Sequence, residues 1–269
     1  MSDLTLPKPS KSWTRAARAA GVTAGYPFFA LGCCVLAVLL AVSPLLVSRP
    51  TQRRILARRL AHHFARLFIW VTNRAALTDV RFEPLPPVEG TLLVANHPTL
   101  MDAIWLIARL PSAVCVLKAD LERFRVLRFL VNRLGYLSNA DPEKVLASAC
   151  ARLAAGETLL MFPEGTRTTP GAPLAFSTGA AEIALRSGAA VQTLVLHTRG
   201  TYLSKARPWW YFPDERIFWQ LQSGPRFAPR TPAPAGSLKD QRAARRAYTA
   251  ELQRVIQTAL ARAGHNGTN

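Results

Sequence analysis

Apolar residues cluster in four short runs between positions 90 and 197, and segments with helical periodicity separate these runs. The runs are residues 90–97, 113–118, 158–162 and 190–197, and the helical segments are 101–110, 121–134, 142–155 and 179–186. Short runs that are apolar throughout are typical of strands buried on both faces of a sheet. Strands alternating with helices predict an α/β fold in which a mixed, largely parallel sheet is flanked by helices.

The N-terminal region has a different pattern, with one long apolar run. No charged residue occurs between positions 19 and 48, and this length is sufficient to enter the hydrocarbon core of a bilayer. Basic clusters flank the run on both sides, which opposes a single crossing. We therefore expect a hairpin or a shallow insertion, broken near Ser43 and Pro44. A cleaved secretory signal is the rival interpretation, and Pro44 directly after Ser43 argues against cleavage.

A basic amphipathic segment follows, in which apolar residues recur at helical spacing between positions 52 and 73. Such a helix either lies in the membrane interface or packs on the domain core, and the pattern leaves both open. The apolar run and this helix together predict an N-terminal two-helix membrane motif.

The composition shifts divide the chain into four expected parts. Residues 1–76 form the membrane-associating helices, and 77–224 form the catalytic domain. Residues 225–236 are rich in proline and predict a linker, and 237–269 form a basic helix with a tail. Ser237 and Asp240 have the spacing of a capping box at the start of that helix.

The charge balance indicates which partners the surface attracts. The chain has 34 Lys and Arg against 16 Asp and Glu, a formal net charge of +18. Such a surface attracts anionic lipid headgroups, acidic carrier proteins, phosphorylated substrates or nucleic acid. No nucleic-acid-binding motif is recognisable, so we expect no nucleic acid partner. The four cysteines lack metal-ligand spacing, and we expect neither a metal nor a disulfide framework.

The first candidate for chemistry is the segment Asn-His-Pro-Thr-Leu-Met-Asp, residues 96–102. His97 comes at the end of a predicted strand, and Pro98 suits the first turn of a helix, which places Asp102 about one turn in. A loop-borne imidazole can fold back over that turn to meet the carboxylate. The pair would fix the tautomer of His97 and leave its other ring nitrogen free to take a proton from a hydroxyl.

The second candidate is Phe-Pro-Glu-Gly-Thr-Arg, residues 162–167, which follows another predicted strand. In open α/β sheets ligands bind beyond the carboxyl ends of the strands. If the two strands are parallel neighbours, His97 and Arg167 meet at one crevice. Gly165 permits close approach of the backbone, and the Arg167 guanidinium offers a planar fork for a phosphate.

Together the two motifs resemble the glycerophosphate and lysophospholipid acyltransferase family, of the bacterial 1-acyl-glycerol-3-phosphate acyltransferase type. The resemblance covers about residues 90–200, and the N-terminal two-helix pattern is also similar to that family. It implies that His97 is the general base and Asp102 its partner, and that the acceptor hydroxyl attacks an acyl thioester directly. It assigns substrate binding to a further group of residues: Asn96, Lys118, Glu164, Gly165, Thr166 and Arg167.

The sequence departs from the family pattern at two places. The family usually has a Gly-x-x-Phe-Ile-x-Arg block between the motifs. Here Ser138 and Asn139 replace the Phe-Ile pair, and Asp141 stands where the arginine would be. Further on, Thr193 and Leu194 replace an expected Pro-Val pair. One phosphate-binding cation is therefore missing, which leaves the identity of the acceptor open.

The expected function is transfer of a fatty acyl group from acyl-CoA or acyl carrier protein to the hydroxyl of a membrane lysolipid such as 1-acyl-glycerol-3-phosphate. No cofactor other than the acyl donor is expected. The expected location is the inner membrane, with the catalytic domain on the cytoplasmic side. The alternatives are an amino-acid lipid or another specialised acceptor, a lipid hydrolase, and a non-catalytic basic membrane scaffold.

Overall fold

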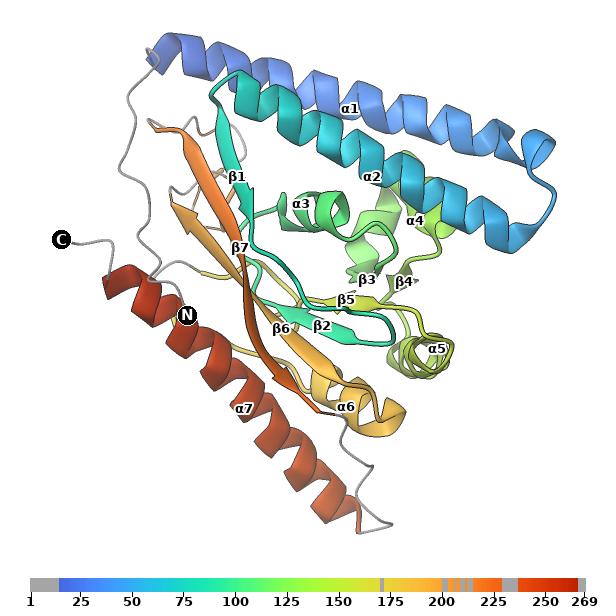
Figure 1. Ribbon diagram of the computed structural model, residues 1–269, viewed down its shortest axis with the longest axis vertical. Helices are drawn as coiled ribbons and strands as arrows, with labels where there is room; N and C mark the ends of the chain where they lie inside the picture. Colours follow the sequence, from blue (N-terminus) through green and yellow to red (C-terminus); the bar gives the residue numbers. More distant parts are fainter. Residues whose placement is uncertain are drawn as a thin grey trace.

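Seven strands form one sheet in the computed structural model of the protein (Figure 1). The structure describes residues 15–169, 172–199, 203–205, 207–208, 211, 215–228 and 237–265. The strand order is β1-β7-β6-β2-β5-β3-β4, and neighbouring strands pair in parallel except for β6 with β7. The strands are β1 (Thr78–Phe82), β2 (Leu92–Ala95), β3 (Val114–Leu117), β4 (Leu137–Ser138), β5 (Leu159–Met161), β6 (Val191–Arg199) and β7 (Ile217–Phe227). The predicted mixed, largely parallel sheet is confirmed.

Helices cover both faces of this sheet (Figure 1). Side chains from α2 and α3 pack on one face, and side chains from α5, α6 and α7 pack on the other. The helices are α1 (Arg15–Leu46), α2 (Pro50–Arg74), α3 (Asp102–Arg109), α4 (Arg125–Leu134), α5 (Pro142–Ala154), α6 (Gly179–Ser187) and α7 (Leu238–His265), with a short 3₁₀ helix η1 (Ala119–Arg123). Strand β2 lies in the middle of the sheet and is buried along its whole length, which explains its continuous apolar sequence.

Helices α1 and α2 lie side by side and run in opposite directions (Figure 1). By length and composition, α1 is able to cross a membrane. Much of its apolar surface is not covered by the rest of the fold, and the exposed side chains are Leu31, Val35, Val38, Leu39, Val42, Leu45 and Leu46. This uncovered apolar surface indicates association with a membrane.

The turn between the two helices lies beyond the point where the sequence predicted it. Pro44 lacks the N–H that would donate to the Leu40 carbonyl oxygen, and this normally interrupts a helix. Here the Ser43 hydroxyl donates to that same oxygen at 2.8 Å. The hydrogen bond compensates for the missing donor, so α1 continues to Leu46 and the turn is formed by residues 47–49.

Helix α2 packs on the domain core, which was one of its two expected positions. Ala57, Ala61 and Ala65 recur every fourth residue on its buried face, and these small side chains allow close packing. Arg58, also largely buried, donates from Nη1 to Glu157 Oε2 at 2.8 Å and from Nε to the Leu134 carbonyl oxygen at 3.0 Å. These bonds attach the N-terminal hairpin to the α/β domain.

Three strands were not recognised in the sequence, namely β1, β4 and β7. Strand β7 also runs three residues past position 224, into the segment predicted to be a linker. Thr193, one of the departures from the family pattern, donates from Oγ1 to the Pro225 carbonyl oxygen at 2.7 Å. This bond and the packing of Phe227 on Tyr248 hold the end of the strand beyond the expected domain boundary at residue 224. Residues 229–236 of the expected linker and residues 1–14 lie outside the described residues.

Candidate active site

The two motifs meet because β2 and β5 are parallel neighbours. Val94 pairs with Met161 at the carboxyl ends of these strands. The chain segments that leave the two strands are hydrogen-bonded, since the Thr168 N–H donates to the His97 carbonyl oxygen at 2.7 Å. The sheet topology therefore positions the site at the carboxyl edge, as the sequence predicted.

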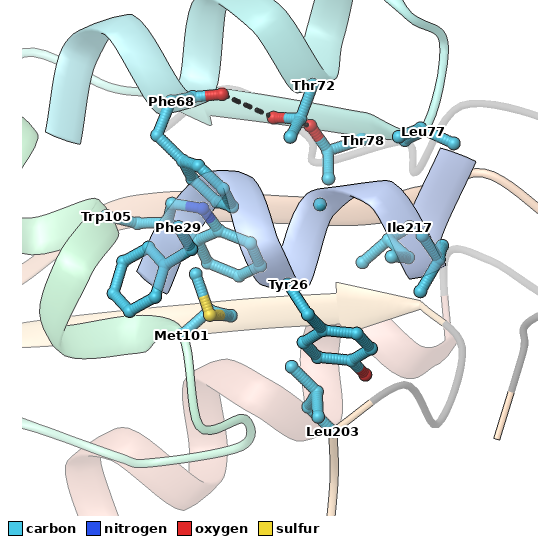
Figure 2. A pocket seen from close by; sticks show the side chains of 12 residues that line it. Tyr26, Phe29, Phe68, Thr72, Leu77, Thr78, Met101, Trp105, Leu203 and Ile217 are labelled. Carbon is cyan, nitrogen blue, oxygen red and sulfur yellow. Dashed lines mark hydrogen bonds between the residues drawn. The ribbon is translucent and has the colours of Figure 1, made fainter. Parts of the chain in front are cut away.

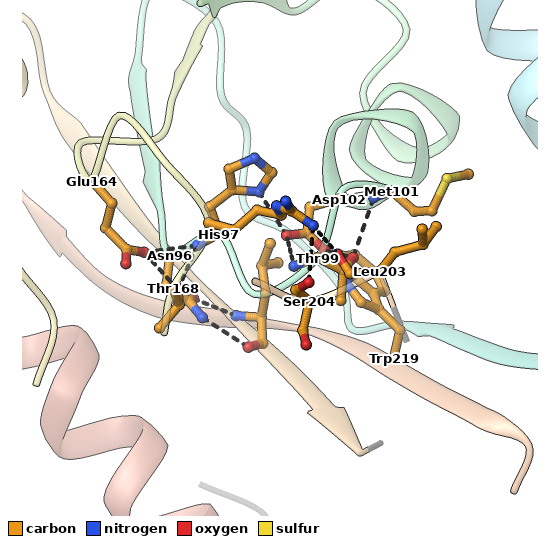
Figure 3. A network of polar contacts seen from close by, with 12 residues as sticks. Asn96, His97, Thr99, Met101, Asp102, Glu164, Thr168, Leu203, Ser204 and Trp219 are labelled. Atoms are coloured by element: carbon orange, nitrogen blue, oxygen red, sulfur yellow. Dashed lines mark hydrogen bonds and ion pairs between the residues drawn. The ribbon is translucent and has the colours of Figure 1, made fainter. Parts of the chain in front are cut away.

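His97 and Asp102 are in direct contact (Figure 3). The distance between His97 Nδ1 and Asp102 Oδ2 is 2.8 Å. The helix predicted to open at Pro98 begins instead at Asp102, because residues 98–101 form a turn. Asp102 is therefore the first residue of α3 rather than one turn inside it. The turn folds the imidazole back over the carboxylate, and Nε2 of His97 points away from the pair as the free ring nitrogen.

The Asp102 side chain is completely buried and accepts four hydrogen bonds (Figure 3). Oδ2 accepts from His97 Nδ1 and from the Thr99 N–H at 2.8 Å. Oδ1 accepts from the Thr99 hydroxyl at 2.6 Å and from Trp219 Nε1 at 2.9 Å. A buried carboxylate is costly unless its oxygens are satisfied, and here both are. Asp102 can therefore hold His97 in the tautomer whose proton is on Nδ1.

The position of His97 is fixed by contacts with the second motif. The Phe162 ring stacks on the imidazole with 4.3 Å between the ring centroids. Glu164 Oε1 accepts from the His97 N–H at 2.9 Å and from the Thr168 hydroxyl at 2.7 Å. Burial raises the pKa of the Glu164 carboxyl, and these hydrogen bonds partly oppose that effect. Glu164 therefore holds the backbone that carries His97.

Asn96 links the catalytic turn to the centre of the sheet. Its side chain is buried, donates to the Leu196 carbonyl oxygen at 2.9 Å and accepts from the Leu196 N–H at 2.8 Å. Both the nitrogen and the oxygen of the side-chain amide are thus hydrogen-bonded to β6. This arrangement keeps β2 and β6 in register directly before His97.

Arg167 is hydrogen-bonded to the protein backbone. Its Nη1 donates to the carbonyl oxygens of Leu203 and Ser204 at 2.8 and 3.0 Å. The Leu203 carbonyl oxygen also accepts from the Leu100 N–H at 3.1 Å, so this contact joins the two motifs through a third segment. Leu203 itself has a positive φ of 51°, which is unfavourable for a branched side chain and marks a constrained turn.

Three other residues of the predicted site have different environments. Gly165 has a φ of 63°, so the turn after β5 needs a residue that accepts the left-handed region. Thr166 is exposed beside it. Lys118 lies at the end of β3, and its ammonium group pairs with Asp120 at 2.6 Å.

An apolar cavity lies between the N-terminal helices and the turn that leads into α3 (Figure 2). Its walls come from α1, α2, α3, the starts of β1 and β7, and the turn at Leu203. The residues that line it include Tyr26, Phe29, Phe68, Met101, Trp105 and Leu203. His97 and Asp102 do not line the cavity, but Met101, which does, directly precedes Asp102 in the chain.

At the missing phosphate-binding position, Asp141 has a structural role. Its carboxylate accepts from the Lys144 N–H at 3.2 Å and caps the start of α5. The Lys144 ammonium also pairs with it at 3.0 Å. Residue 141 therefore stabilises a helix end and carries a negative charge where the family has a cation.

Several residues of the site were missed in the sequence. Thr99 and Asp102 have the spacing of a capping box, so the Thr99 hydrogen bonds had a recognisable signal. Phe162 is the first residue of the second motif, and Thr168 directly follows the motif. Trp219 comes from a strand that was not predicted, more than a hundred positions away, and no local pattern points to it.

Comparison with known proteins agrees with this geometry. Residues 78–197 match the family model described as "Acyltransferase". A similar solved structure is the 1-acyl-sn-glycerophosphate (LPA) acyltransferase PlsC from Thermotoga maritima. It has 20% sequence identity and a TM-score of 0.59, and the match covers 90% of this chain and 97% of that chain. At this level of identity the likeness concerns the fold. No curated protein matches the chain.

The contacts of Glu164 predict a difference between two substitutions. Glu164→Gln keeps an oxygen that can accept from the His97 N–H and the Thr168 hydroxyl, so the free energy of unfolding should change little. Glu164→Ala leaves both donors without this acceptor and should lower the free energy of unfolding by about 1–3 kcal/mol. Denaturant unfolding in detergent micelles measures both. Equal losses in the two variants would contradict the role of Glu164 as an acceptor.

Proposed function

We propose that the chain is an acyltransferase, as the match of residues 78–197 to that family model supports, and that it moves a fatty acyl group from acyl-CoA or acyl carrier protein to the hydroxyl of a membrane lysolipid such as 1-acyl-glycerol-3-phosphate. The observation that carries the proposal is the contact between His97 and the buried Asp102 beside an apolar cavity. The pair supplies a base, and the cavity supplies a place for an acyl chain. This chemistry needs only the acyl donor and the acceptor in addition to the protein.

In the proposed reaction His97 is the general base. Asp102 holds the proton of the neutral imidazole on Nδ1, so the lone pair of Nε2 is available to the acceptor hydroxyl. As that hydroxyl oxygen attacks the thioester carbonyl carbon, its proton passes to Nε2. The positive charge that forms on the ring lies against the Asp102 carboxylate, which stabilises it.

The tetrahedral intermediate then collapses. The bond between carbon and sulfur breaks, an ester remains on the acceptor, and the thiolate takes the proton from Nε2. His97 returns to its neutral state without a covalent acyl-enzyme. Phe162 and Glu164 keep the ring and its backbone in place through both steps.

The cavity supports an apolar chain as part of the substrate. Tyr26 and Phe29 of α1 form one wall, and Met101 and Leu203 lie close to the catalytic turn. We propose that a short segment of the fatty acyl chain occupies this space, which is about 70 Å³ in volume, with the thioester carbonyl toward His97. The exposed apolar side of α1 would then lie in the lipid from which the acceptor comes.

The acceptor headgroup would bind on the second motif. Gly165 and Thr166 are on an exposed turn next to Arg167, whose guanidinium provides the positive charge. Lys118 is a further cation that we assign to the anionic part of a substrate, after release from Asp120. Asn96 and Glu164 would act by holding the backbone of the site.

One observation favours an acceptor without a phosphate monoester. Asp141 stands where the family has an arginine, and it caps α5 instead of binding an anion. The second candidate function is therefore acylation of an amino-acid lipid or another specialised product by the same catalytic pair.

The proposed location is the inner membrane, with the catalytic domain on the cytoplasmic side. The basic clusters on both sides of the apolar run support this location, because the positive-inside bias favours keeping both on the cytoplasmic side, where the excess of Lys and Arg attracts anionic headgroups. Acyl-CoA and acyl carrier protein are found on that side.

The direct test of the proposed base is His97→Ala. The variant should lose acyl transfer by about 100-fold or more, because no other group would take the proton from the acceptor. Transfer of a radiolabelled acyl chain to lipid in mixed micelles measures it. His63→Ala is the matched control, since His63 is exposed on α2 and should leave the rate unchanged. Full activity of His97→Ala would rule out the mechanism.

The acceptor is tested by a panel of lysolipids with and without a phosphate monoester. If 1-acyl-glycerol-3-phosphate is the acceptor, Arg167→Gln should raise its KM about 10-fold or more, because a charge-assisted contact is lost. Its effect on a neutral acceptor should be smaller. Arg186→Gln is the control, since Arg186 lies on α6 and is exposed. Turnover of only non-phosphate acceptors would favour the second candidate function.

A further inference from the structure

Strand β7 brings a tryptophan to the catalytic carboxylate. Trp219 is completely buried, and its Nε1 donates to Asp102 Oδ1 at 2.9 Å (Figure 3). The family match ends at residue 197, so Trp219 lies outside the matched segment. Its partner across the sheet is Thr198 of β6, and on the other side it pairs with Val80 of β1.

The indole ring is held on two sides. The Phe82 ring meets it edge-on with 5.8 Å between centroids, and the Trp105 ring lies 5.1 Å away on the other element, α3. Because both neighbours are themselves buried or partly buried in the same core, the Nε1–H has a fixed direction. It therefore acts as a rigid donor, unlike a hydroxyl group.

A rigid donor at Oδ1 fixes the plane of the carboxylate. The terminal torsion of an aspartate side chain is broad and is set by the hydrogen bonds that its oxygens accept. At Oδ2 the Thr99 backbone N–H is a fixed donor, whereas at Oδ1 the other donor is the Thr99 hydroxyl, which rotates. Trp219 thus supplies the second fixed point that defines how Oδ2 faces His97.

Burial alone does not account for this hydrogen bond. Trp105 lies in the same core, is 2% exposed, and its Nε1 has no hydrogen-bond partner among the described residues. The core therefore accommodates an indole N–H without an acceptor. The two neighbouring tryptophans differ in that only Trp219 is directed at Asp102.

We propose that Trp219 is a positioning residue of the catalytic pair, which acts by orienting the Asp102 carboxylate toward His97. The inference rests on the proposed acyl transfer. It makes β7 part of the catalytic centre, although the strand contributes no group that touches the substrate. Loss of the indole donor should slow the chemical step without weakening substrate binding.

Two matched substitutions test this proposal. Trp219→Phe and Trp105→Phe each replace a buried indole by a smaller phenyl ring. Only the first substitution removes a hydrogen-bond donor to Asp102. Trp219→Phe should lower kcat about 10-fold or more, as expected for the loss of a hydrogen bond to a charged group, with KM within twofold. Trp105→Phe should lower kcat less than about threefold and should change mainly the KM of the acyl donor, since Trp105 lines the cavity. Thermal unfolding of both variants measures the shared packing loss.

A double variant separates positioning from general damage. If Trp219 acts through Asp102, adding Trp219→Phe to Asp102→Ala should lower the residual kcat no further than adding Trp105→Phe does. The inference would be overturned if the kcat losses of Trp219→Phe and Asp102→Ala multiply in the double variant, or if the two tryptophan variants lose kcat equally. Neither result would contradict the proposed acyl transfer of the wild type. A wild-type protein without transfer to any acceptor in the panel would overturn the proposed function and this inference with it.

Discussion

The structure of the site depends on one buried carboxylate. Asp102 has no exposed surface, and an ionised group in that position is tolerated only if its oxygens are fully hydrogen-bonded. The four donors come from the turn after β2, from His97 and from β7. Each of these segments must therefore be in its native place for the charge to remain satisfied, which links the catalytic geometry to the folding of the whole sheet.

The turn that carries His97 and Asp102 is also connected to the N-terminal helices α1 and α2. The turn that carries the pair packs against a cavity whose other walls are α1 and α2, and Arg58 attaches α2 to the α/β domain. In the proposed reaction an acyl chain in this cavity would reach His97 from the apolar side of the protein. The acceptor hydroxyl would reach the same nitrogen from the polar side, where Arg167 and the turn at Gly165 lie. In that reaction the two substrates would approach His97 from different sides.

Much of this was predictable from local sequence. The central strands are apolar along their length, and the motifs at residues 96–102 and 162–167 follow two of them, so parallel pairing was sufficient to predict that they meet. The position of the α1 turn was not predictable from Pro44 alone, because the compensating hydrogen bond of Ser43 depends on a side-chain rotamer. The start of α3 was misplaced for a different reason, because Pro98 suits a first helical turn although the spacing of Thr99 and Asp102 was recognisable.

The long-range part of the site was beyond local patterns. Strand β7 lacks a continuous apolar run, because its C-terminal half is polar and less buried. It forms a strand because it pairs with β6 and β1. The direction of the Trp219 indole follows from that register. Likewise, the bonds of Arg167 to the carbonyl oxygens of Leu203 and Ser204 depend on a turn far along the chain. The sequence motifs predicted that His97 and Asp102 would meet, and the fold determines what orients them.

The most direct measurement of the central claim is the tautomer of the His97 ring. Nuclear magnetic resonance of the protein with ¹⁵N-labelled histidine, assigned with a His97 variant, distinguishes a protonated from an unprotonated ring nitrogen. At a pH where the ring is neutral, we expect a proton on Nδ1, slow exchange of that proton with water, and an unprotonated Nε2. A ring with its proton on Nε2, or an averaged mixture of both tautomers, would show that Asp102 does not hold His97 as a base.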